Sequence, residues 1–374
     1  MKLQGNNGPN PTVSSICGRF CVLALILINL TCSDDPITRH LLGPEIGIDD
    51  TTTTSHGFSF RTFTLGNGPS IVNDVAIIND TMAIAVGFIN KNDSLGRRVE
   101  PPFNIARWDG RTWTLDSIGV KYPDGFYDVE EMSSILAFSE KDIIVSTGGK
   151  LFHWDGKKWT LFWDLMAQVG PIGSAFKLWG RSSKDFYAIG KGSIIHWNGS
   201  GWQKLDSHTT MTMQDIWGEQ NPRTGADEVY CLACEQDSFL GKKVIKIEGL
   251  LTSEMDTTGL SPLLAGIWCV PGKKYYIVGS SVFWKSDIRS SESWTKQKPG
   301  EIIQYYGEAI RGTAWNDIFI TGGYGGLSHF NGKTWTTYSM KPIIAFWRLA
   351  FKGNMVIAVG NYGQIGGIAV GTRH

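Results

Sequence analysis

A nine-residue phrase that recurs along this chain limits what it can fold into more than any other feature. Each copy has an apolar run ending in an aromatic residue, then Asp-Gly or Asn-Gly, two further residues and a tryptophan. Asp-Gly and Asn-Gly tolerate the positive φ angles of a two-residue hairpin turn. Such a turn would make the two aromatic residues of each hairpin diagonal neighbours on one face. Four copies stand at residues 105–113, 151–159, 194–202 and 327–335.

The aromatic residues that close this phrase give the length of the repeat. The intervals between successive tryptophans are 46, 43, 92 and 41 residues, so the longest one contains two units, one of them degenerate. Two more apolar runs precede each hairpin. Four short strands in about 40–50 residues are typical of a β-propeller blade. The closing tryptophans are Trp113, Trp159, Trp202, Trp294 and Trp335.

The two ends of the propeller region together supply one further blade. Residues 61–65 nearly duplicate residues 111–115, with Phe63 in the place of the tryptophan, yet no blade-like run precedes them. After Trp335 three apolar runs follow without a fourth. The sequence therefore predicts an all-β, seven-bladed propeller of four-stranded blades, in which the N-terminal strand completes the last blade.

The N-terminal region has the features of an export signal. Lys2 and Arg19 precede an apolar run at residues 21–30. Ten apolar residues are too few to span a bilayer, but they match the central part of a secretory signal. The following polar stretch has no periodicity and reads as a tether. We predict a signal peptide at 1–31, a polar tether at 32–56 and a single propeller domain at 57–374.

Cys32 directly after this apolar run resembles the lipidated cysteine of bacterial lipoproteins, and Ser33-Asp34-Asp35 is similar to an acidic surface-export tag. Thr31 departs from the small residue that such a site prefers. The resemblance implies a lipid anchor on Cys32 and a location at the bacterial outer membrane or cell surface. A soluble secreted or periplasmic protein and an uncleaved membrane anchor are the alternatives.

Charge and motifs exclude several classes of function. The 35 Lys and Arg residues balance the 35 Asp and Glu residues, so no global field attracts nucleic acid or an anionic membrane. No phosphate-binding loop, nucleophile elbow or zinc spacing occurs. Three histidines, His153, His196 and His329, repeat at one position of different hairpins and are not expected to converge on a metal. We predict a monomer without cofactor or metal that contacts a membrane only through its anchor.

The strand pattern resembles kelch-type repeats and related secreted bacterial propellers with a His-Trp-Asp-Gly…Trp phrase. Single glycines end the second strand of several units, whereas kelch repeats carry a pair. Residues 286–294 are similar to an Asp-box hairpin, which we interpret as a structural turn. The resemblance implies the fold and no particular activity. The glycines are Gly87, Gly190, Gly279 and Gly360, and pairs occur at residues 148–149 and 322–323.

Three cysteines follow the tether. Cys231 and Cys234 lie three apart in a predicted strand, so their side chains point to opposite faces. We expect them to pack in the core. A disulfide from one of them to Cys269, and a redox-active pair, are the alternatives.

Aromatic residues provide the candidate binding positions. Trp179, Trp217, Trp268 and Trp315 end predicted inner strands, where they either pack between blades or form an aromatic ring at one mouth of the channel. Three loops break the period and are better placed for function than the scaffold. They are residues 90–102, residues 117–128 with Tyr122, Phe126 and Tyr127, and residues 220–227.

We predict a non-catalytic, surface-tethered propeller that binds or scaffolds a protein or glycan partner. The alternative is a carbohydrate-active hydrolase or lyase, which would need paired carboxylates near the central channel. A third candidate is an assembly factor for a complex of the cell envelope.

Overall fold

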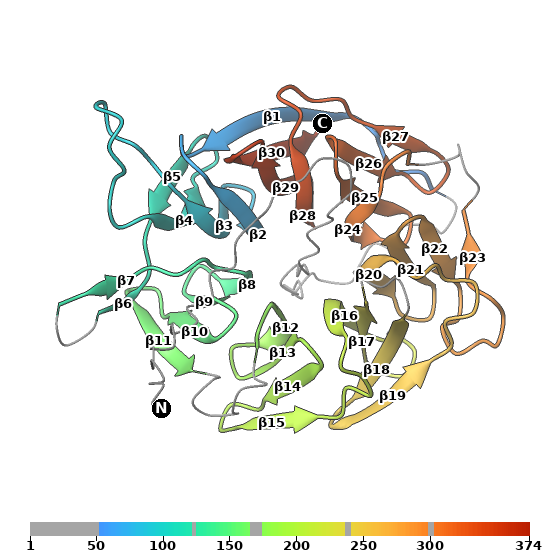
Figure 1. Ribbon diagram of the computed structural model, residues 1–374. Coiled ribbons are helices and arrows are strands. Elements are labelled where there is room, and N and C mark those ends of the chain that lie inside the picture. The colour runs from blue at the N-terminus through green and yellow to red at the C-terminus, as the bar shows by residue number, and fades with distance from the viewer. Residues whose placement is uncertain (1–51, 122–124, 165–173, 236–240, 298–302) are drawn as a thin grey trace, which may run out of the picture.

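The computed structural model describes residues 52–121, 125–164, 174–235, 241–297 and 303–374. Seven four-stranded antiparallel sheets stand around a central channel, as Figure 1 shows, which confirms the predicted seven-bladed propeller. The predicted signal peptide, Cys32 and most of the tether lie outside the described residues. No helix long and apolar enough to cross a bilayer occurs in the part of the chain that the structure describes.

Each blade begins with the strand next to the channel and ends with the strand at the rim. In blade order the strands are β2 (Ile71–Asn79), β3 (Met82–Ile89), β4 (Phe103–Trp108) and β5 (Trp113–Asp116); β8 (Ser134–Ser139), β9 (Asp142–Ser146), β10 (Lys150–Trp154) and β11 (Trp159–Asp164); β12 (Lys177–Ser182), β13 (Asp185–Gly190), β14 (Ser193–Trp197) and β15 (Trp202–Leu205); β16 (Thr212–Gln220), β17 (Asp227–Cys234), β18 (Lys242–Glu248) and β19 (Leu251–Met255); β20 (Leu264–Val270), β21 (Lys274–Gly279), β22 (Val282–Lys285) and β23 (Thr295–Lys296); β24 (Gly307–Ala314), β25 (Asp317–Gly322), β26 (Gly326–Phe330) and β27 (Trp335–Thr337); and β28 (Ala345–Lys352), β29 (Met355–Tyr362), β30 (Ile365–Arg373) and β1 (Phe58–Leu65). A small hairpin, β6 (Val120–Lys121) and β7 (Tyr127–Asp128), stands between blades 1 and 2.

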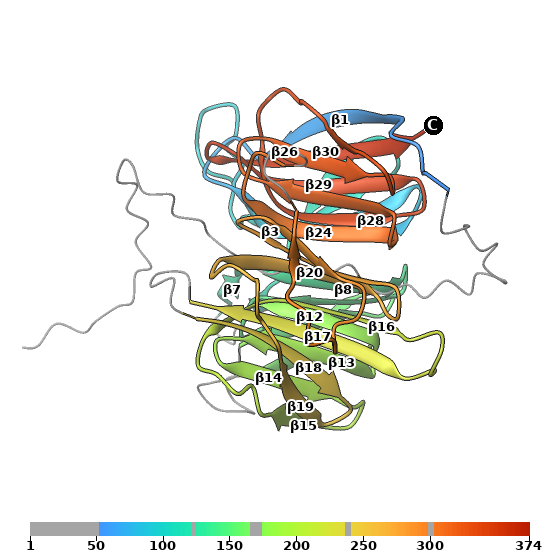
Figure 2. The same ribbon diagram turned by 90° about the vertical axis from the view of Figure 1, so that its right-hand side faces the viewer.

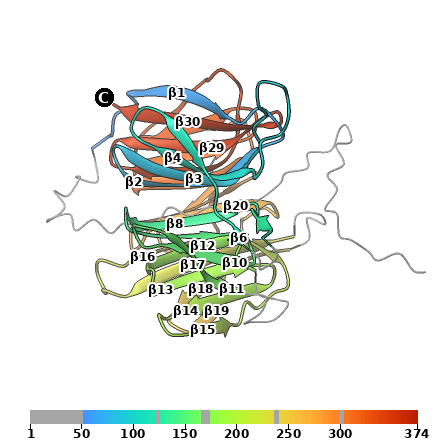
Figure 3. The ribbon, with the colours of Figure 1, turned by 90° about the vertical axis from the view of Figure 1, so that its left-hand side faces the viewer.

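The N-terminal strand closes the ring as predicted. β1 pairs with β30 in an unbroken antiparallel register from Phe58 opposite Arg373 to Leu65 opposite Gly366. Figures 2 and 3 show β1 lying along the outer edge of blade 7, next to the C-terminus. The degenerate repeat forms blade 4, where Gly249 takes the turn position with a φ of 60°.

The repeated hairpin has a longer turn than the sequence predicted. Trp108 lies directly opposite Trp113, not diagonal to it, with ring centroids 5.3 Å apart. Four residues form the turn because the Asp109 carboxylate accepts hydrogen bonds from the backbone N–H of Arg111 (2.8 Å) and Thr112 (2.7 Å). The same two bonds recur at the Asp or Asn of the other three copies, Asp155, Asn198 and Asn331.

A bulge at the start of the innermost strand explains the glycines that end the second strand. In blade 7 the register of β28 shifts between Phe346 and Arg348. The preceding carbonyl, that of Ala345, would then lie 1.8 Å from any Cβ atom at Gly360. A Cβ at Gly87, Gly279 or Gly322 would meet a carbonyl oxygen at 2.1–2.2 Å in the same way. Only a glycine fits where these two backbones approach so closely.

A buried polar cluster fastens the closing strand to blade 6. The Nδ1 atoms of His56 and His329 are 2.8 Å apart, and His329 Nε2 lies 2.8 Å from Asp317 Oδ1. Arg373 at the end of β30 forms an ion pair with Asp317. Thr54 Oγ1 donates a further hydrogen bond to Asp317 Oδ1 at 3.0 Å. One carboxylate thus joins the second strand of blade 6 to both strands that close the ring.

This cluster makes ring closure sensitive to acid. Burial lowers the pKa of both His56 and His329, and the charge of Arg373 lowers both further. Two imidazole nitrogens in contact need one proton between them, so full protonation of both rings removes the acceptor. Because the pKa values are lower in the folded protein, this stabilisation is present above the unfolded value of about 6.5 and is lost as the pH falls below it.

We therefore expect the free energy of unfolding to decrease between pH 7.5 and pH 5.0, and to decrease less in the His56→Gln variant. Urea denaturation at the two pH values measures both changes. His208→Gln, at an upper-face loop of blade 3, serves as the control and is expected to keep the pH dependence of the wild type. Equal pH dependence in His56→Gln and the wild type would contradict the assignment.

Candidate functional site

The propeller has two different faces. We call the face at which the seven innermost strands begin the upper face, and the face at which they end the lower face. Figures 2 and 3 show the C-terminus and the loop between β3 and β4 on opposite sides of the ring. The loop at residues 90–102 and the described parts of the loop at 117–128, residues 117–121 and 125–128, therefore lie on the upper face, and the loop at residues 220–227 lies on the lower face.

Polar side chains on the innermost strands join three of the blades to the blade that follows them. Asp74 Oδ2 of blade 1 accepts a hydrogen bond from the backbone N–H of Ile135 in blade 2 (3.2 Å). Asp215 Oδ2 of blade 4 accepts the equivalent bond from Ile267 in blade 5 (2.9 Å). Ser134 takes the same role from blade 2 to blade 3. These are inner-edge N–H groups that a sheet cannot satisfy by itself.

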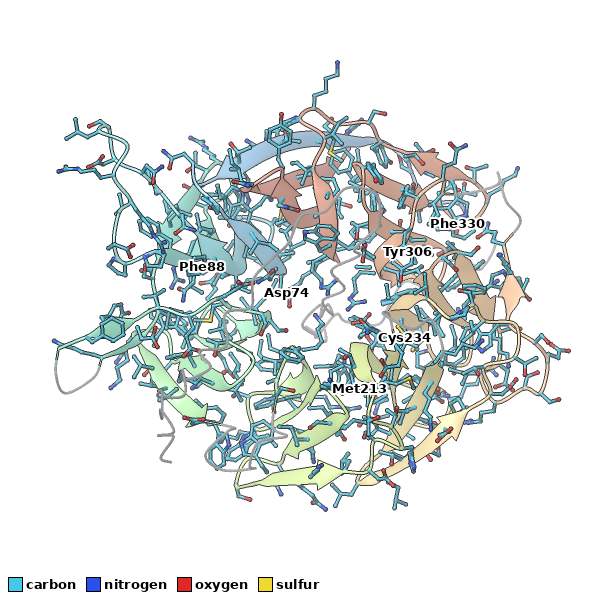
Figure 4. The ribbon with its side chains drawn as sticks, in the orientation of Figure 1. Asp74, Phe88, Met213, Cys234, Tyr306 and Phe330 are labelled. Atoms are coloured by element: carbon cyan, nitrogen blue, oxygen red, sulfur yellow. The ribbon has the colours of Figure 1, made fainter. Side chains whose placement is uncertain are left out.

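Two buried ion pairs span one blade each. Lys177 Nζ of blade 3 lies 3.3 Å from Asp74 Oδ2 of blade 1. Arg311 of blade 6 binds both carboxylate oxygens of Asp215 of blade 4, at 3.0 and 3.1 Å. The blade in between has a small residue at the equivalent position, Gly266 in the second case, which leaves room for the long side chain. Figure 4 shows Asp74 at the channel.

The predicted aromatic positions divide into two kinds. Trp179, Trp217 and Trp268 occupy equivalent positions, and each is buried. Trp179 packs where Gly218 of the next blade leaves space, and Trp268 does so against Gly312. The fourth predicted position, Trp315, is not equivalent, because it lies in the turn after β24.

Arg311 takes the tryptophan position in blade 6. Its guanidinium carbon is 5.0 Å from the Trp217 ring centroid. Equivalent tryptophans at this position thus fill the spaces between blades, and an ion pair replaces them in blade 6. The hairpin aromatics predicted as structural, Trp113, Trp159, Trp202, Trp294, Trp335 and Phe63, lie at or beside the outer strands.

The three repeated histidines each bind an aspartate that begins the neighbouring strand. His153 Nε2 is 2.8 Å from Asp142, His196 Nε2 is 2.7 Å from Asp185, and His329 pairs with Asp317 as above. We did not predict these aspartates, although a repeated Asp before each second strand is visible in the sequence. No group of three or more His, Cys, Asp or Glu within the described ranges is arranged to hold a metal.

The cysteines have the surroundings of core residues. Cys234 and Cys269 carry free thiols, so the alternative of a disulfide to Cys269 is not formed. Burial raises the pKa of Cys234 to about 11 and that of Cys269 well above its ordinary value. Both thiols stay protonated at neutral pH and are poor nucleophiles.

Glu308 is the one carboxylate of the described innermost strands with a buried oxygen that lacks a hydrogen-bond partner. It is the bulge residue at the start of β24, only 3% of it is exposed, and its Oε2 has no hydrogen-bond partner. Burial raises its pKa to about 8, against the opposing charge of Arg348. The hydroxyl of Tyr306, two residues earlier, is also buried without a partner. A residue of this kind could not be recognised from the sequence, because no motif marks a bulge.

The exposed apolar surface is concentrated on the upper face. Ten large apolar or aromatic side chains are exposed among the described residues, and seven of them lie on this face. Two of the seven, Phe126 and Tyr127, were predicted as binding candidates, whereas Tyr122 lies outside the described residues. The other five are Leu95, Phe176, Tyr324, Ile343 and Tyr362.

Three of these side chains occupy one sector of the upper face, which we call the blade 6–7 sector. Tyr324 is 88% exposed and has a positive φ of 57° in the loop between β25 and β26. A Cβ atom at Gly325 beside it would lie 3.3 Å from the Ile343 side chain of the following loop. Tyr362 ends β29 on the next blade. The loops at residues 322–326 and 361–365 contain no charged residue, whereas Lys341 lies two residues before Ile343.

We expect the buried ion pairs to be structural. Asp215→Asn should lower the free energy of unfolding by about 3–5 kcal/mol, because it leaves the Arg311 charge buried without its carboxylate. Replacing both residues, as Asp215→Leu with Arg311→Met, should cost markedly less. Chemical denaturation measures both values.

The exposed pair Lys243–Glu254 provides the control for this prediction. Glu254→Gln should change stability by less than about 1 kcal/mol. A double variant that is as unstable as Asp215→Asn would show that the pair contributes net stability of its own.

The comparisons with known proteins identify the fold. No protein-family model matches the chain, and no curated protein does so either. Among solved structures, YCF48 bound to D1 peptide is 15% identical with a TM-score of 0.62, over 86% of this chain and 100% of that chain.

Two further structures give the same picture. YCF48 from Cyanidioschyzon merolae is 10% identical with a TM-score of 0.56, over 83% of this chain and 98% of that one. The WD40 β-propeller domain of Doa1 is 11% identical with a TM-score of 0.58, over 86% and 98%. At these identities the similarity shows a shared propeller fold.

Proposed function

We propose that this chain is a non-catalytic binding module that holds a segment of a partner protein on its upper face. The observation that carries the proposal is the placement of seven of the ten exposed large apolar side chains on this one face. Exposed apolar side chains on the loops of a rigid scaffold are typical of interaction surfaces. The solved structure of YCF48 with a D1 peptide is a precedent for a propeller of this fold with a bound peptide.

The channel chemistry favours binding over hydrolysis. A glycosidase needs two carboxyl groups about 5–10 Å apart that can act on a substrate. Asp74 and Asp215 are each engaged with a cation and with backbone N–H groups. Arg348 is the one charged residue that affects the pKa of Glu308 within the described part of the chain, so no second carboxylate accompanies it there.

The lower face has a different role in this proposal. Residues 52–56 lie against blade 6, where the Asn316 side chain donates a hydrogen bond to the Thr52 carbonyl (2.8 Å) and the Thr54 N–H donates to the Asn331 carbonyl (3.0 Å). The last residues of the predicted tether therefore meet the propeller on the lower side. We propose that Cys32 carries a lipid at a bacterial outer membrane or cell surface, and that the upper face remains accessible.

The kelch-like and Asp-box-like relationship belongs to the same proposal. It is supported by the glycines at the ends of second strands and by the turn at Asp287, whose carboxylate accepts a hydrogen bond from the Arg289 N–H at 2.9 Å. Exposed Tyr324 and Tyr362 rings also suit stacking on a sugar, so a glycan is the second candidate ligand.

The proposal can be tested with a library of random twelve-residue peptides selected against the immobilised full chain. We expect selected peptides to bind at least about tenfold more weakly to a variant carrying Tyr324→Ser, Ile343→Ser and Tyr362→Ser, because exposed anchors of this kind dominate binding energy. A matched control changes two exposed residues of the lower face, Leu250→Ser and Leu251→Ser, and should bind like the wild type.

Two outcomes would overturn this proposal. In one, no peptide is enriched while a glycan array gives binding that the upper-face variant loses. In the other, a bound glycan is turned over, which would make the chain an enzyme. Peptides that respond to the lower-face control and not to the upper-face variant would place the site on the wrong face.

The anchor has its own test. We expect Cys32→Ser to move the protein from the membrane fraction to the soluble fraction of the producing cells, because a serine cannot accept the thioether-linked lipid. Fractionation with immunodetection measures the change. Thr31→Ala should retain the protein in the membrane fraction. A Cys32→Ser protein that stays with the membranes would exclude lipidation as the anchor.

A further inference from the structure

The upper mouth of the channel contains two buried polar groups that have no partner. They are the carboxyl of Glu308 and the hydroxyl of Tyr306, both at the start of blade 6. Leaving a buried polar group without a hydrogen bond costs about 1–3 kcal/mol. A buried carboxyl oxygen and a buried phenol two residues apart, both without a hydrogen bond, indicate a place where a ligand could supply the missing bonds.

The neighbouring blade has small side chains beside these groups. At the bulge and the following position, most blades have larger side chains, such as Gln214 and Asp215 in blade 4. Blade 5 has Ala265 and Gly266 there, the smallest pair of the ring. Figure 4 shows Tyr306, Cys234 and Met213 on the same side of the channel. The small residues of blade 5 thus lie between Gln214 on one side and Glu308 on the other.

The charges at this mouth favour an anion. Among the fully buried charged side chains of the described innermost strands, and with Glu308 protonated, three cations (Lys177, Arg311 and Arg348) stand beside two carboxylates (Asp74 and Asp215). A protonated carboxyl and a phenol both donate hydrogen bonds. A ligand with a carboxylate could accept from both, close to the charge of Arg348.

We propose that the upper mouth of the channel between blades 5 and 6 is a carboxylate-binding site, in which Glu308 and Tyr306 donate hydrogen bonds to the ligand and Arg348 supplies a favourable charge. The inference rests on the proposed function in one respect: the carboxylate belongs to the bound protein segment, as an acidic side chain or as a chain end. The inference names the polar group of the ligand, which the apolar side chains of the upper face do not define.

The site gives binding a particular dependence on pH. Glu308 donates a hydrogen bond only while it is protonated, and its pKa is about 8. The groups that act on the pair from neighbouring elements are Arg348 of β28 and Cys234 of β17. Cys234 has a pKa of about 11 and that of Tyr306 is raised further, so neither titrates between pH 6.5 and pH 9.5. The facing residues of β20 and β25, Ala265, Gly266 and Thr321, do not ionise.

The experiment uses acetate as the probe and acetamide as its neutral counterpart of the same shape. Saturation-transfer NMR titrations on the full chain give dissociation constants at pH 6.5 and pH 9.5. We expect acetate to bind at pH 6.5 and at least about tenfold more weakly at pH 9.5. The higher pH lies more than one unit above the Glu308 pKa of about 8, so the carboxyl has lost its proton there. Acetamide should bind weakly, and equally, at both pH values.

Two variants identify the residues. Glu308→Gln keeps an N–H donor and cannot ionise, so it should bind acetate at pH 6.5 within about threefold of the wild type and lose the pH dependence. Tyr306→Phe should bind about five- to tenfold more weakly at pH 6.5, the equivalent of one hydrogen bond. Glu292→Gln, at an exposed turn of blade 5, is the control and should behave like the wild type.

The wild-type titration alone can overturn the proposal, so the result does not depend on a variant folding. Acetate that binds no better than acetamide, or equally at both pH values, contradicts a carboxylate site. A Glu308→Gln variant that keeps the wild-type pH dependence assigns the titrating group elsewhere and contradicts it too. The peptide selection and the acetate titration can fail independently of each other, because acetate binding does not require the apolar side chains of the blade 6–7 sector.

Discussion

The pairing of β1 with β30 is the contact on which the rest of the structure depends. A propeller has no core shared by all blades, so each sheet is stabilised by its two neighbours, and an open ring would leave two blades with an unpacked face. The pairing brings Phe58 and Arg373 next to Asp317 of blade 6. The ion pair of Lys177 with Asp74 depends on blade packing too, since Lys177 reaches Asp74 only while blades 1 to 3 keep their places.

The innermost strands satisfy a second constraint. Seven strand edges pack around the channel, and their backbone N–H and C=O groups still need hydrogen-bond partners. Each way of meeting this constraint requires a particular kind of residue at one position. A bulge turns the start of the strand and presses a carbonyl against the next strand, which requires glycine at Gly360 and its equivalents. An oxygen such as that of Asp215 then accepts the inner-edge N–H of the following blade. Glu308 stands at the same bulge without any such bond, which distinguishes it from a structural residue.

The sequence predicted what depends on local chemistry and periodicity. The hairpin phrase, its spacing and the Phe63 strand were sufficient for seven blades and their closure. It missed contacts between residues that are distant in the chain, such as Arg311 with Asp215, because nothing local marks them. The sequence grouped Trp315 with three other tryptophans at the ends of inner strands, but Arg311 takes the equivalent position in blade 6 and Trp315 lies in the turn after β24. The candidate binding face needed the fold first, since only the ring brings Tyr324, Ile343 and Tyr362 together.

The lower face contains the contacts that stabilise ring closure, and the upper face contains most of the exposed apolar side chains. The closing segment, its histidine cluster and the Asp-His pairs are gathered toward the lower ends of the strands, where hairpin turns are short and fixed by Asp or Asn side chains. The upper face carries the irregular loops, the exposed rings and the unsatisfied carboxyl of Glu308. Polar groups left without partners and apolar groups left in water are both costly, and the upper face holds Glu308, Tyr306 and most of the exposed apolar side chains. A single ligand that is apolar along most of its length and acidic at one point would relieve both costs at once.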